Sequence, residues 1–408
     1  MKSNTIIFLY NQLNDPVIQS NIYLYIMDIA MLREGNQQFA LITFETAETL
    51  AKSESLQRIK QDLAKLNIHW YPCQWHPGTN MSNKLIDFFS SFYQIIKLRI
   101  AGYRHVISLA SVAGSYAYLY SVALRMKLYL YQYEPHSEYE LDSGTYTKDS
   151  LTFKLLNFLE KRSAMYATVI SSGTGHMMER LKNWKVKAGV FKIPSVVNDQ
   201  KFIFSEEDRN EIRKKYGIPY ESLVLYYPGK FGGLYYGRET VAMFRILLNK
   251  DSRFHVLVVT PNDLSEIEKF FLKEGIEKHR YTLTHAAFDV IQKYHSAADF
   301  AIIAAPPGPS KKFVSNIKVG EYLCSGLPYL ICKGVSEDDE YAKKYNVGVV
   351  VKDFDEIHIE KAYNGIENIL ALPTEFRREY CRKVGIEYRG FKYLKLEFRK
   401  AFNLLMSS

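Results

Sequence analysis

The sequence predicts an α/β protein made of two doubly wound domains, each built on a parallel sheet. From residue 5 onward, apolar runs of strand length alternate with segments of helix length, which is the pattern of parallel βαβ units. The alternation breaks once, at residues 193–202, and then resumes. A chain of 408 residues also exceeds what one hydrophobic core usually holds, so two domains are expected.

The first predicted domain covers residues 1–195. Its helices are expected near 17–33, 47–66, 82–100, 112–125, 150–165 and 174–184, and its strands near 5–10, 39–45, 68–74, 104–109, 127–133, 167–172 and 189–193. Ligands of such sheets bind beyond the carboxyl ends of the strands. The loops that follow the strands are therefore the places where a site is expected.

The second predicted domain covers residues 196–385, and a final segment, 386–408, is expected to form a helix. Helices are predicted at 206–216, 239–248, 288–297, 376–385 and 393–406, and strands at 223–227, 255–260, 281–286, 300–305, 329–332 and 347–351. Asp353 and Asp355 imitate a metal-binding pair, but their position between a strand and a helix indicates helix capping.

The segment from Asn316 to Pro328 has the form of a helix that begins at a binding site. Ser315 or Asn316 can cap its start, and Gly326 followed by Pro328 ends it. An apolar strand and a loop rich in Pro and Gly come directly before it. A helix N-terminus with nearby lysines suits a phosphate group, and Glu321 lies within reach of a sugar hydroxyl of the same ligand.

This segment resembles the donor-site signature of retaining family 4 glycosyltransferases, in which Lys-x-x-Glu-Tyr-Leu-x-x-Gly-Leu-Pro follows a Pro/Ser loop. In that family the Glu holds the ribose hydroxyls of the nucleotide sugar, and Glu321 matches it. The resemblance places Ser315, Asn316 and Ile317 in the same donor site. Many members have a second Glu eight positions earlier, which contacts the transferred sugar, but here that position is Phe313.

The loop at 228–238, Pro-Gly-Lys-Phe-Gly-Gly-Leu-Tyr-Tyr-Gly-Arg, joins a strand to a helix. Its glycines and two cations suit a pyrophosphate. In the family, an Arg and a Lys in this loop neutralise the leaving diphosphate. Lys230 matches the Arg position, and Arg238 is the nearest substitute for the Lys. The resemblance thus implies donor contacts from Gly229, Lys230, Gly232 and Arg238, and from His285 near the nucleobase.

Two further segments match the family in the expected order. Residues 194–202 are similar to its Pro-x-x-Val-Asp-x-x-x-Phe linker, with Asn198 where Asp is usual. His136, in the loop after the strand at 127–133, matches a His that commonly lies beside the transferred sugar. Its neighbours Tyr133, Glu134 and Glu138 are candidates to hold acceptor hydroxyls.

The helix at 82–100 is unusually aromatic, and its sequence supports two interpretations. Its spacing fits core packing. Alternatively, Phe92 and Tyr93 insert among lipids while Lys84, Lys97, Arg99 and Arg104 meet anionic headgroups. The net charge of +9 allows an anionic membrane face or a phosphate-bearing acceptor. No cluster of cations with interleaved aromatics predicts nucleic-acid binding.

The resemblance implies a GT-B fold, in which two Rossmann-like domains face a central cleft and the C-terminal helix, in residues 386–408, returns to pack on the first domain. It also implies transfer of a sugar from a nucleoside diphosphate donor, with retention of configuration and no essential metal. Bacterial surface polysaccharide synthesis on a glycan or lipid-linked acceptor is expected by analogy only. The alternatives are a non-catalytic GT-B subunit that binds a glycan or a partner enzyme, and a nucleotide-sugar epimerase.

A cytoplasmic protein is expected, with possible contact at the inner face of the membrane. The apolar part of the first residues is short for a signal peptide, and no apolar run approaches the roughly 20 residues that cross a bilayer. The four cysteines lack metal-site spacing, which indicates reduced thiols.

Overall fold

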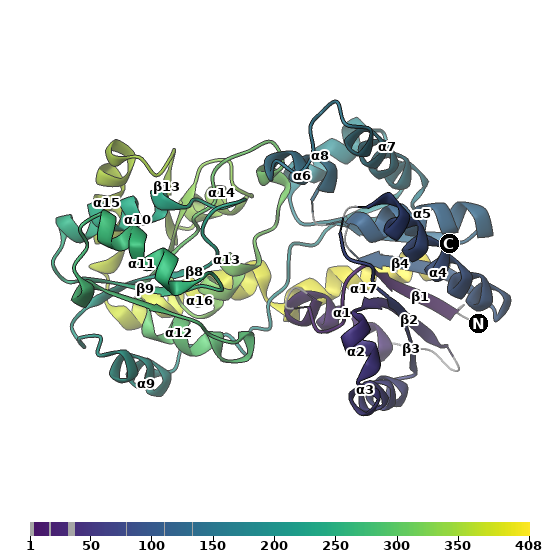
Figure 1. Cartoon of the computed structure of the whole chain (residues 1–408), viewed down its shortest axis with the longest axis horizontal. Coiled ribbons are helices and arrows are strands. Elements are labelled where there is room, and N and C mark those ends of the chain that lie inside the picture. Colours follow the sequence, from purple (N-terminus) through teal and green to yellow (C-terminus); the bar gives the residue numbers. More distant parts are fainter. Residues whose placement is uncertain (1–3, 16–17, 32–36, 79, 110, 133) are drawn as a thin grey trace. The chain divides into compact units, whose positions relative to one another are not determined.

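In a computed structural model, residues 4–15, 18–31, 37–78, 80–109, 111–132 and 134–408 are described. The chain divides into two compact units (Figure 1). Unit 1 comprises Met1–Val196 and Leu394–Ser408, and unit 2 comprises Val197–Tyr393.

The described part of unit 1 contains a seven-stranded parallel sheet in the order β3-β2-β1-β4-β5-β6-β7. Its strands are β1 (Asn4–Leu9), β2 (Phe39–Glu45), β3 (Ile68–Gln74), β4 (Tyr103–Leu109), β5 (Lys127–Gln132), β6 (Val169–Ser172) and β7 (Gly189–Lys192). The parallel sheet and its seven strands are confirmed. Strands β1 and β2 are buried on both faces, which is why they read as apolar runs without alternation.

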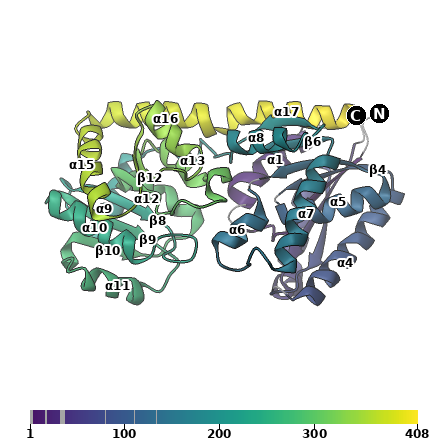
Figure 2. The ribbon, with the colours of Figure 1, turned by 90° about the horizontal axis from the view of Figure 1, so that it is seen from above.

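Helices cover both faces of this sheet (Figure 2). Helices α4, α5 and α7 lie on one face, and α1 and α17 on the other. The helices of unit 1 are α1 (Tyr23–Met31), α2 (Ala47–Ala51), α3 (Ser53–Lys65), α4 (Met81–Ile100), α5 (Ser111–Leu124), α6 (His136–Asp142), α7 (Leu151–Tyr166) and α8 (Gly175–Asn183). The last helix, α17 (Phe391–Ser407), belongs to unit 1 from Leu394 onward.

Two side chains of α17 anchor it on α1. The ring of Phe398 stacks on that of Tyr25 with centroids 4.2 Å apart. The Arg399 guanidinium forms a bidentate ion pair with Asp28, with Nε donating to Oδ2 at 2.7 Å. A buried aromatic pair next to a bidentate ion pair sets both the position and the direction of the helix.

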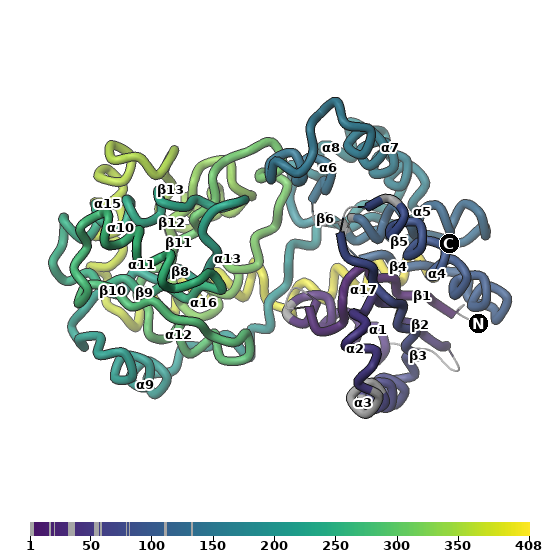
Figure 3. The backbone as a smooth tube through the Cα atoms, viewed as in Figure 1, coloured from purple at the N-terminus to yellow at the C-terminus, as the bar shows by residue number. Residues whose placement is uncertain are grey.

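In unit 2, as in unit 1, strands alternate with helices along the chain (Figure 3). Its described sheet has six parallel strands in the order β10-β9-β8-β11-β12-β13. They are β8 (Leu223–Pro228), β9 (Phe254–Val259), β10 (Tyr281–Thr284), β11 (Phe300–Ile302), β12 (Tyr329–Cys332) and β13 (Gly348–Val351). The α-helices are α9 (Glu206–Tyr216), α10 (Arg238–Lys250), α11 (Leu264–Lys273), α12 (Ile291–Ala297), α13 (Ile317–Cys324), α14 (Asp338–Lys344), α15 (Glu356–Leu370) and α16 (Thr374–Arg389).

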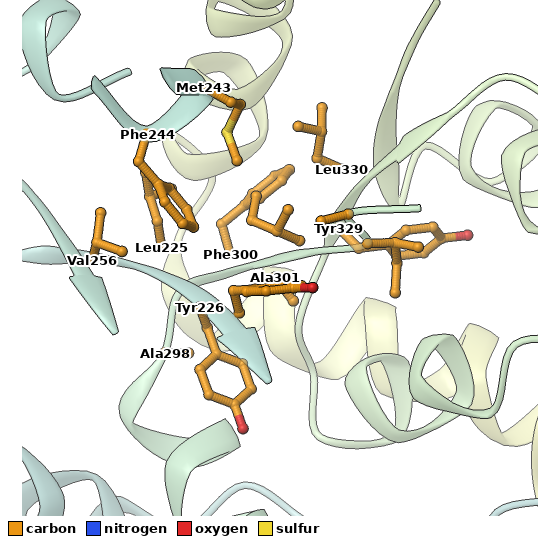
Figure 4. Close-up of a cluster of buried hydrophobic side chains, with 14 of the residues drawn as sticks. Leu225, Tyr226, Met243, Phe244, Val256, Ala298, Phe300, Ala301, Tyr329 and Leu330 are labelled. Carbon is orange, nitrogen blue, oxygen red and sulfur yellow. The ribbon is translucent and has the colours of Figure 1, made fainter. Parts of the chain in front are cut away.

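Successive side chains of β8 enter opposite halves of the unit 2 core (Figure 4). Leu225 lies toward Phe244 of α10, whereas Tyr226 points to the other side of the sheet. There the Tyr226 ring meets His295 of α12 and Tyr322 of α13, with centroid distances of 5.3 and 6.2 Å. Because successive side chains of a strand point to opposite faces of the sheet, Tyr226 packs against α13 while Leu225 packs on the other face.

Helix α13 packs on α16 through glycines. A Cβ on Gly385 of α16 would lie 2.6 Å from the Leu323 Cβ and 2.7 Å from the backbone N of Cys324. A Cβ on Gly320 of α13 would lie 2.6 Å from Val197 Cγ2. Larger residues here would force the helices apart, so these glycines hold α13 in its place.

Several predicted elements differ from the structure. The expected helix at 47–66 is two helices separated at Lys52, and residues 18–22 form a π-helical turn before α1. The strand expected at 300–305 ends at Ile302, and a 3-10 turn, Phe288–Val290, precedes α12. Short helices α6, α11 and α14 were not predicted. Their 7 to 10 residues give weak periodicity, so tertiary packing decides them.

Candidate functional site

Helix α13 begins at a side-chain cap, as the sequence predicts. The Asn316 side chain accepts a hydrogen bond from the Lys318 backbone N–H at 3.1 Å. Gly326, with φ of 77°, follows its carboxyl end in the left-handed region. Of the two predicted caps, Asn316 fills this role, whereas the Ser315 hydroxyl accepts from Nη1 of the buried Arg389 at 2.8 Å.

Glu321 is a buried carboxylate among cations. Its side chain is 7% exposed, and burial raises its pKa to about 7, although Lys318 and Lys201 act to lower it. Burial lowers the pKa of Lys318 to about 8, with Glu321 opposing that shift and Lys230 adding to it. Glu321, Lys318, Lys201 and Lys230 therefore share one electrostatic environment, which we call the donor-side cluster.

Lys201 is a member of this cluster that sequence reasoning missed. Its Nζ donates to the Phe288 carbonyl at 3.0 Å and lies 4.0 Å from the centre of the Phe288 ring. Lys201 belongs to the 194–202 segment that matches the family linker. Its position in a segment that matches the family could have marked Lys201 as a candidate. Only the fold, however, shows that this segment lies beside α13.

The loop between β8 and α10 has a backbone that requires glycine. Gly232 and Gly233 adopt positive φ values of 82° and 65°, and a Cβ on Gly229 would lie 2.7 Å from the Tyr227 ring. The Tyr227 hydroxyl donates to the Lys230 carbonyl, and the Phe231 N–H donates to Asn262 Oδ1 at 3.0 Å. The loop backbone is thus held while the Lys230 side chain stays exposed.

The remaining predicted donor residues are Arg238, His285 and Ile317, and Ile317 is the first residue of α13. Arg238 is the first residue of α10, and its guanidinium lies 5.4 Å from the centre of the Phe270 ring of α11. His285 Nδ1 lies 2.6 Å from the Thr260 carbonyl oxygen. A carbonyl only accepts, so Nδ1 is the donor in this contact. Phe313, at the position of the missing Glu, is 4% exposed.

Unit 1 contains a cavity of about 660 Å³, which we call the unit 1 cavity. It lies beyond the carboxyl ends of β1 to β5, as expected for a doubly wound sheet, and continues between α4, α5 and α7. Its lining includes Tyr10, Asn11, Gln12, Asp15, Lys84, Leu85, Phe88, Tyr116, Leu119, His136, Glu140, Thr152, Leu155, Leu156 and Leu159.

One wall of the unit 1 cavity carries a network around the buried Asp87. The Tyr10 hydroxyl donates to Asp87 Oδ2, and His76 Nδ1 lies 2.7 Å from Oδ1. Lys84 Nζ donates to the Tyr10 hydroxyl at 2.9 Å. Burial and the bond to Asp87 raise the pKa of Tyr10 far above its usual value. Tyr10 therefore stays protonated and keeps Lys84 at the cavity wall.

The predicted residues near the strand at 127–133 lie in different surroundings in the structure. His136 lines the unit 1 cavity, but it is the first residue of α6 and not a loop residue. Its Nε2 lies 3.6 Å from Glu140 Oε1, and burial lowers its pKa. Glu138 instead pairs with Arg180 of α8 at 2.9 Å. Glu134 is not among the lining residues, and Tyr133 lies outside the described residues.

The aromatic helix α4 carries both buried and exposed apolar side chains. Ile95 and Leu98 are buried in the core, whereas Phe89 and Tyr93 are 61% and 57% exposed. The membrane alternative places Phe92 among lipids, but its ring stacks on that of Tyr120 with centroids 5.2 Å apart. For Phe92 the structure fits the core-packing alternative, because the i, i+4 spacing directs Phe92 and Phe88 together onto α5.

The structure bears on three other predictions. Asp355 caps α15, with its side chain accepting from the His358 N–H at 2.9 Å, so the capping prediction is confirmed. Among the described residues, no group of His, Cys, Asp and Glu is arranged to hold a metal ion. Across the same residues, no helix has the length and hydrophobicity needed to span a bilayer.

No protein-family model and no curated protein matches this sequence. Solved structures do match along nearly the full chain. Sucrose-phosphate synthase from Thermosynechococcus elongatus has a TM-score of 0.70 at 14% identity, covering 99% of both chains. A glycosyltransferase from Rickettsia africae has the same TM-score and identity, covering 100% of both chains.

HepE from Anabaena, in complex with UDP and glucose, has a TM-score of 0.68 at 11% identity, covering 99% of this chain and 100% of that one. Together with the two parallel-sheet units, these likenesses define a two-domain Rossmann-like GT-B fold. The predicted fold class is confirmed. The same fold also occurs in the N-terminal domain of trehalose-6-phosphate phosphatase from Candida albicans, so fold alone does not assign a reaction.

Proposed function

We propose that this protein is a glycosyltransferase that moves a sugar from a nucleoside diphosphate sugar to an acceptor hydroxyl, with retention of configuration. The observation that carries the proposal is the donor-side cluster at the start of α13. Departure of the diphosphate develops negative charge, which fixed cations and backbone amides stabilise. Lys230 and Lys318 supply charge, α13 supplies amides, and Glu321 is an acceptor for the ribose hydroxyls.

The ligands of a structural neighbour support a UDP sugar as the first donor to test. HepE binds UDP and UDP-glucose in its crystals, and WaaG, with a TM-score of 0.62, is described as a glycosyltransferase of lipopolysaccharide biosynthesis. Retention, independence from metal and a role in bacterial surface polysaccharides rest on the resemblance of the Glu321 segment. His136 would shield and orient the sugar.

The donor site is tested by thermal unfolding with UDP, GDP, ADP, CMP and their sugar conjugates. A ligand that binds only the native state raises the melting temperature. One nucleotide is expected to do so, and Glu321→Ala should weaken its binding roughly 10- to 100-fold, because hydrogen bonds to a charged acceptor contribute about 1.5–3 kcal/mol. Glu266→Ala, on the exposed surface of α11, should leave the response unchanged.

A non-catalytic GT-B subunit is the second candidate, favoured by the buried Phe313 in place of a sugar-contacting Glu. Such a subunit has no need for the donor-side cluster. Absence of any nucleotide response at millimolar concentration, in a protein that unfolds cooperatively, would favour the subunit over the enzyme.

We further propose that α4, α5 and α7 rest on an anionic membrane face. Among the described residues, 12 of the 23 exposed large hydrophobic side chains lie on these three helices, so the apolar exposure is concentrated there. Their only acidic residues, Asp87 and Glu160, are 0% and 3% exposed. The exposed surface therefore combines apolar side chains with cations alone, as interfacial segments do. The exposed cations are Lys97, Lys154, Lys161 and Arg162, whereas Lys84 and Arg99 are half-buried.

Sedimentation with vesicles tests this membrane contact. The protein should bind phosphatidylglycerol vesicles and bind neutral phosphatidylcholine vesicles much less. Replacing both Lys154 and Lys161 by Gln should weaken binding roughly 30-fold, since each lysine near an anionic surface contributes about 1 kcal/mol. The matched control replaces Lys60 and Lys65 of α3 by Gln. Equal losses in the two variants would point to net charge and contradict a specific surface.

A further inference from the structure

The unit 1 cavity is polar at one end and apolar at the other. Asn11, Gln12 and Asp15, in the loop after β1, line it together with His136 and Glu140 of α6. Away from the strand ends, its walls include Phe88 of α4, Leu119 of α5, and Leu155, Leu156 and Leu159 of α7, beside the polar side chains of Lys84, Tyr116 and Thr152. A sugar ring needs hydrogen-bond partners on most of its edges, and the five apolar side chains offer none. The apolar end therefore suits a hydrocarbon better than a carbohydrate.

The apolar end opens on the surface proposed to meet the membrane. Leu85, Leu119 and Leu155 line the cavity, yet they are 49%, 37% and 49% exposed. Helix α5 lies between α4 and α7 (Figure 2), so these three leucines belong to one side of unit 1. The exposed Phe89 of α4, Val122 of α5 and Phe158 of α7 extend the same apolar surface. A chain leaving a lipid layer would thus meet apolar side chains on this side of the cavity.

We propose that the unit 1 cavity holds the aliphatic chain of an amphiphilic acceptor, with the polar headgroup at the end lined by Asn11 and His136. This rests on the proposed function, since it names the acceptor class of that reaction. The chain would be buried between α4, α5 and α7, and each Å² of apolar surface removed from water contributes about 25 cal/mol. A free oligosaccharide would leave these walls in contact with water.

The test is the binding of dansylated undecanoic acid, a fluorescent amphiphile, to the full chain without vesicles and below its micelle concentration. Saturable binding is expected. Leu155→Glu places a charge on the cavity wall, where an unpaired charge is costly, and should weaken binding at least tenfold. The matched control, Phe158→Glu, lies on the same helix outside the lining and is 58% exposed. It should bind the probe within twofold of the parent protein.

A second variant and a second measurement keep the result interpretable. Leu85→Glu, from α4, should repeat the Leu155→Glu loss, and both variants should keep the parent's nucleotide-induced rise in melting temperature. Absence of saturable binding, unchanged binding in both variants, or displacement of the probe by a short glycan without a chain would overturn the inference. A nucleotide response without probe binding refutes the lipid acceptor alone, whereas probe binding without any nucleotide response refutes the proposed reaction and, with it, the acceptor role.

Competition with the fluorescent probe shows which kind of lipid chain the unit 1 cavity binds. Geranylgeranyl phosphate carries an isoprenoid chain and lysophosphatidic acid carries an acyl chain, and both present a phosphate headgroup. Displacement of the probe by either one supports the cavity assignment, and the stronger competitor indicates which kind of chain the acceptor contains. Failure of both to displace a saturably bound probe would count against an amphiphilic acceptor.

Discussion

Replacing Lys230 by alanine is expected to lower kcat/KM for sugar transfer by roughly 10²- to 10³-fold, the loss typical when one group that stabilises transition-state charge is removed. The side chain is exposed and its backbone is fixed by Tyr227 and the glycine loop. Stability should therefore change little. Steady-state rates with the identified nucleotide sugar, measured beside the melting temperature, separate the two effects.

Two further variants sharpen this prediction. Lys230→Arg keeps the positive charge and should recover part of the activity. Lys214→Ala removes an exposed lysine of α9 and should leave the rate unchanged. Activity of Lys230→Ala within threefold of the parent enzyme would remove Lys230 from the site and leave Lys318 as the main cation of the cluster.

Asp299→Ala is expected to destabilise unit 2 by about 3–5 kcal/mol, the usual cost of leaving buried charges without their partner. Asp299 is 2% exposed. It accepts from Arg213 Nη2 at 2.8 Å, Arg209 Nη2 at 3.1 Å and the Val224 N–H at 2.8 Å. Arg377 and Arg378 lie 3.9 and 4.0 Å away. Burial lowers the pKa of Arg378 to about 9, and Asp299 opposes that shift. Loss of the carboxylate would therefore leave this buried guanidinium without its opposing charge.

Urea unfolding measures this loss, with Asp263→Ala as the graded control. Asp263 is an exposed residue that caps α11 by accepting from the Ser265 N–H at 2.8 Å, so its loss should cost about 1 kcal/mol. Similar midpoints for the two variants would show that the arginines of the Asp299 group find other partners.

Much of the candidate site follows from local sequence. Asn316 and Gly326 bound α13 because a side-chain cap and a left-handed residue act within one helical turn. The strands were predictable because a strand buried on both faces must be a short apolar run. The rule for parallel sheets also pointed to the loop after β1 and to His136, and both line the unit 1 cavity.

Other parts of the site are set by contacts between residues far apart in the chain. Lys201 meets Phe288 and Glu321 only after the segment at 194–202 packs beside α12 and α13. Asp87 gains Tyr10 and His76 as partners only when α4 packs on the sheet. Glu138 was predicted on the acceptor side, but the fold pairs it with Arg180, a contact that strand-end position does not reveal.

The sequence alone determined the two-domain α/β architecture, the order of the strands along the chain and the helix that carries Glu321, because hydrophobic period, caps and glycines act over a few residues. Tertiary structure decided which charges meet, which aromatic residues of α4 face solvent, and that leucines from three helices enclose one cavity. Burial and charge pairing depend on neighbours that are distant in sequence, and only the folded chain brings those neighbours together.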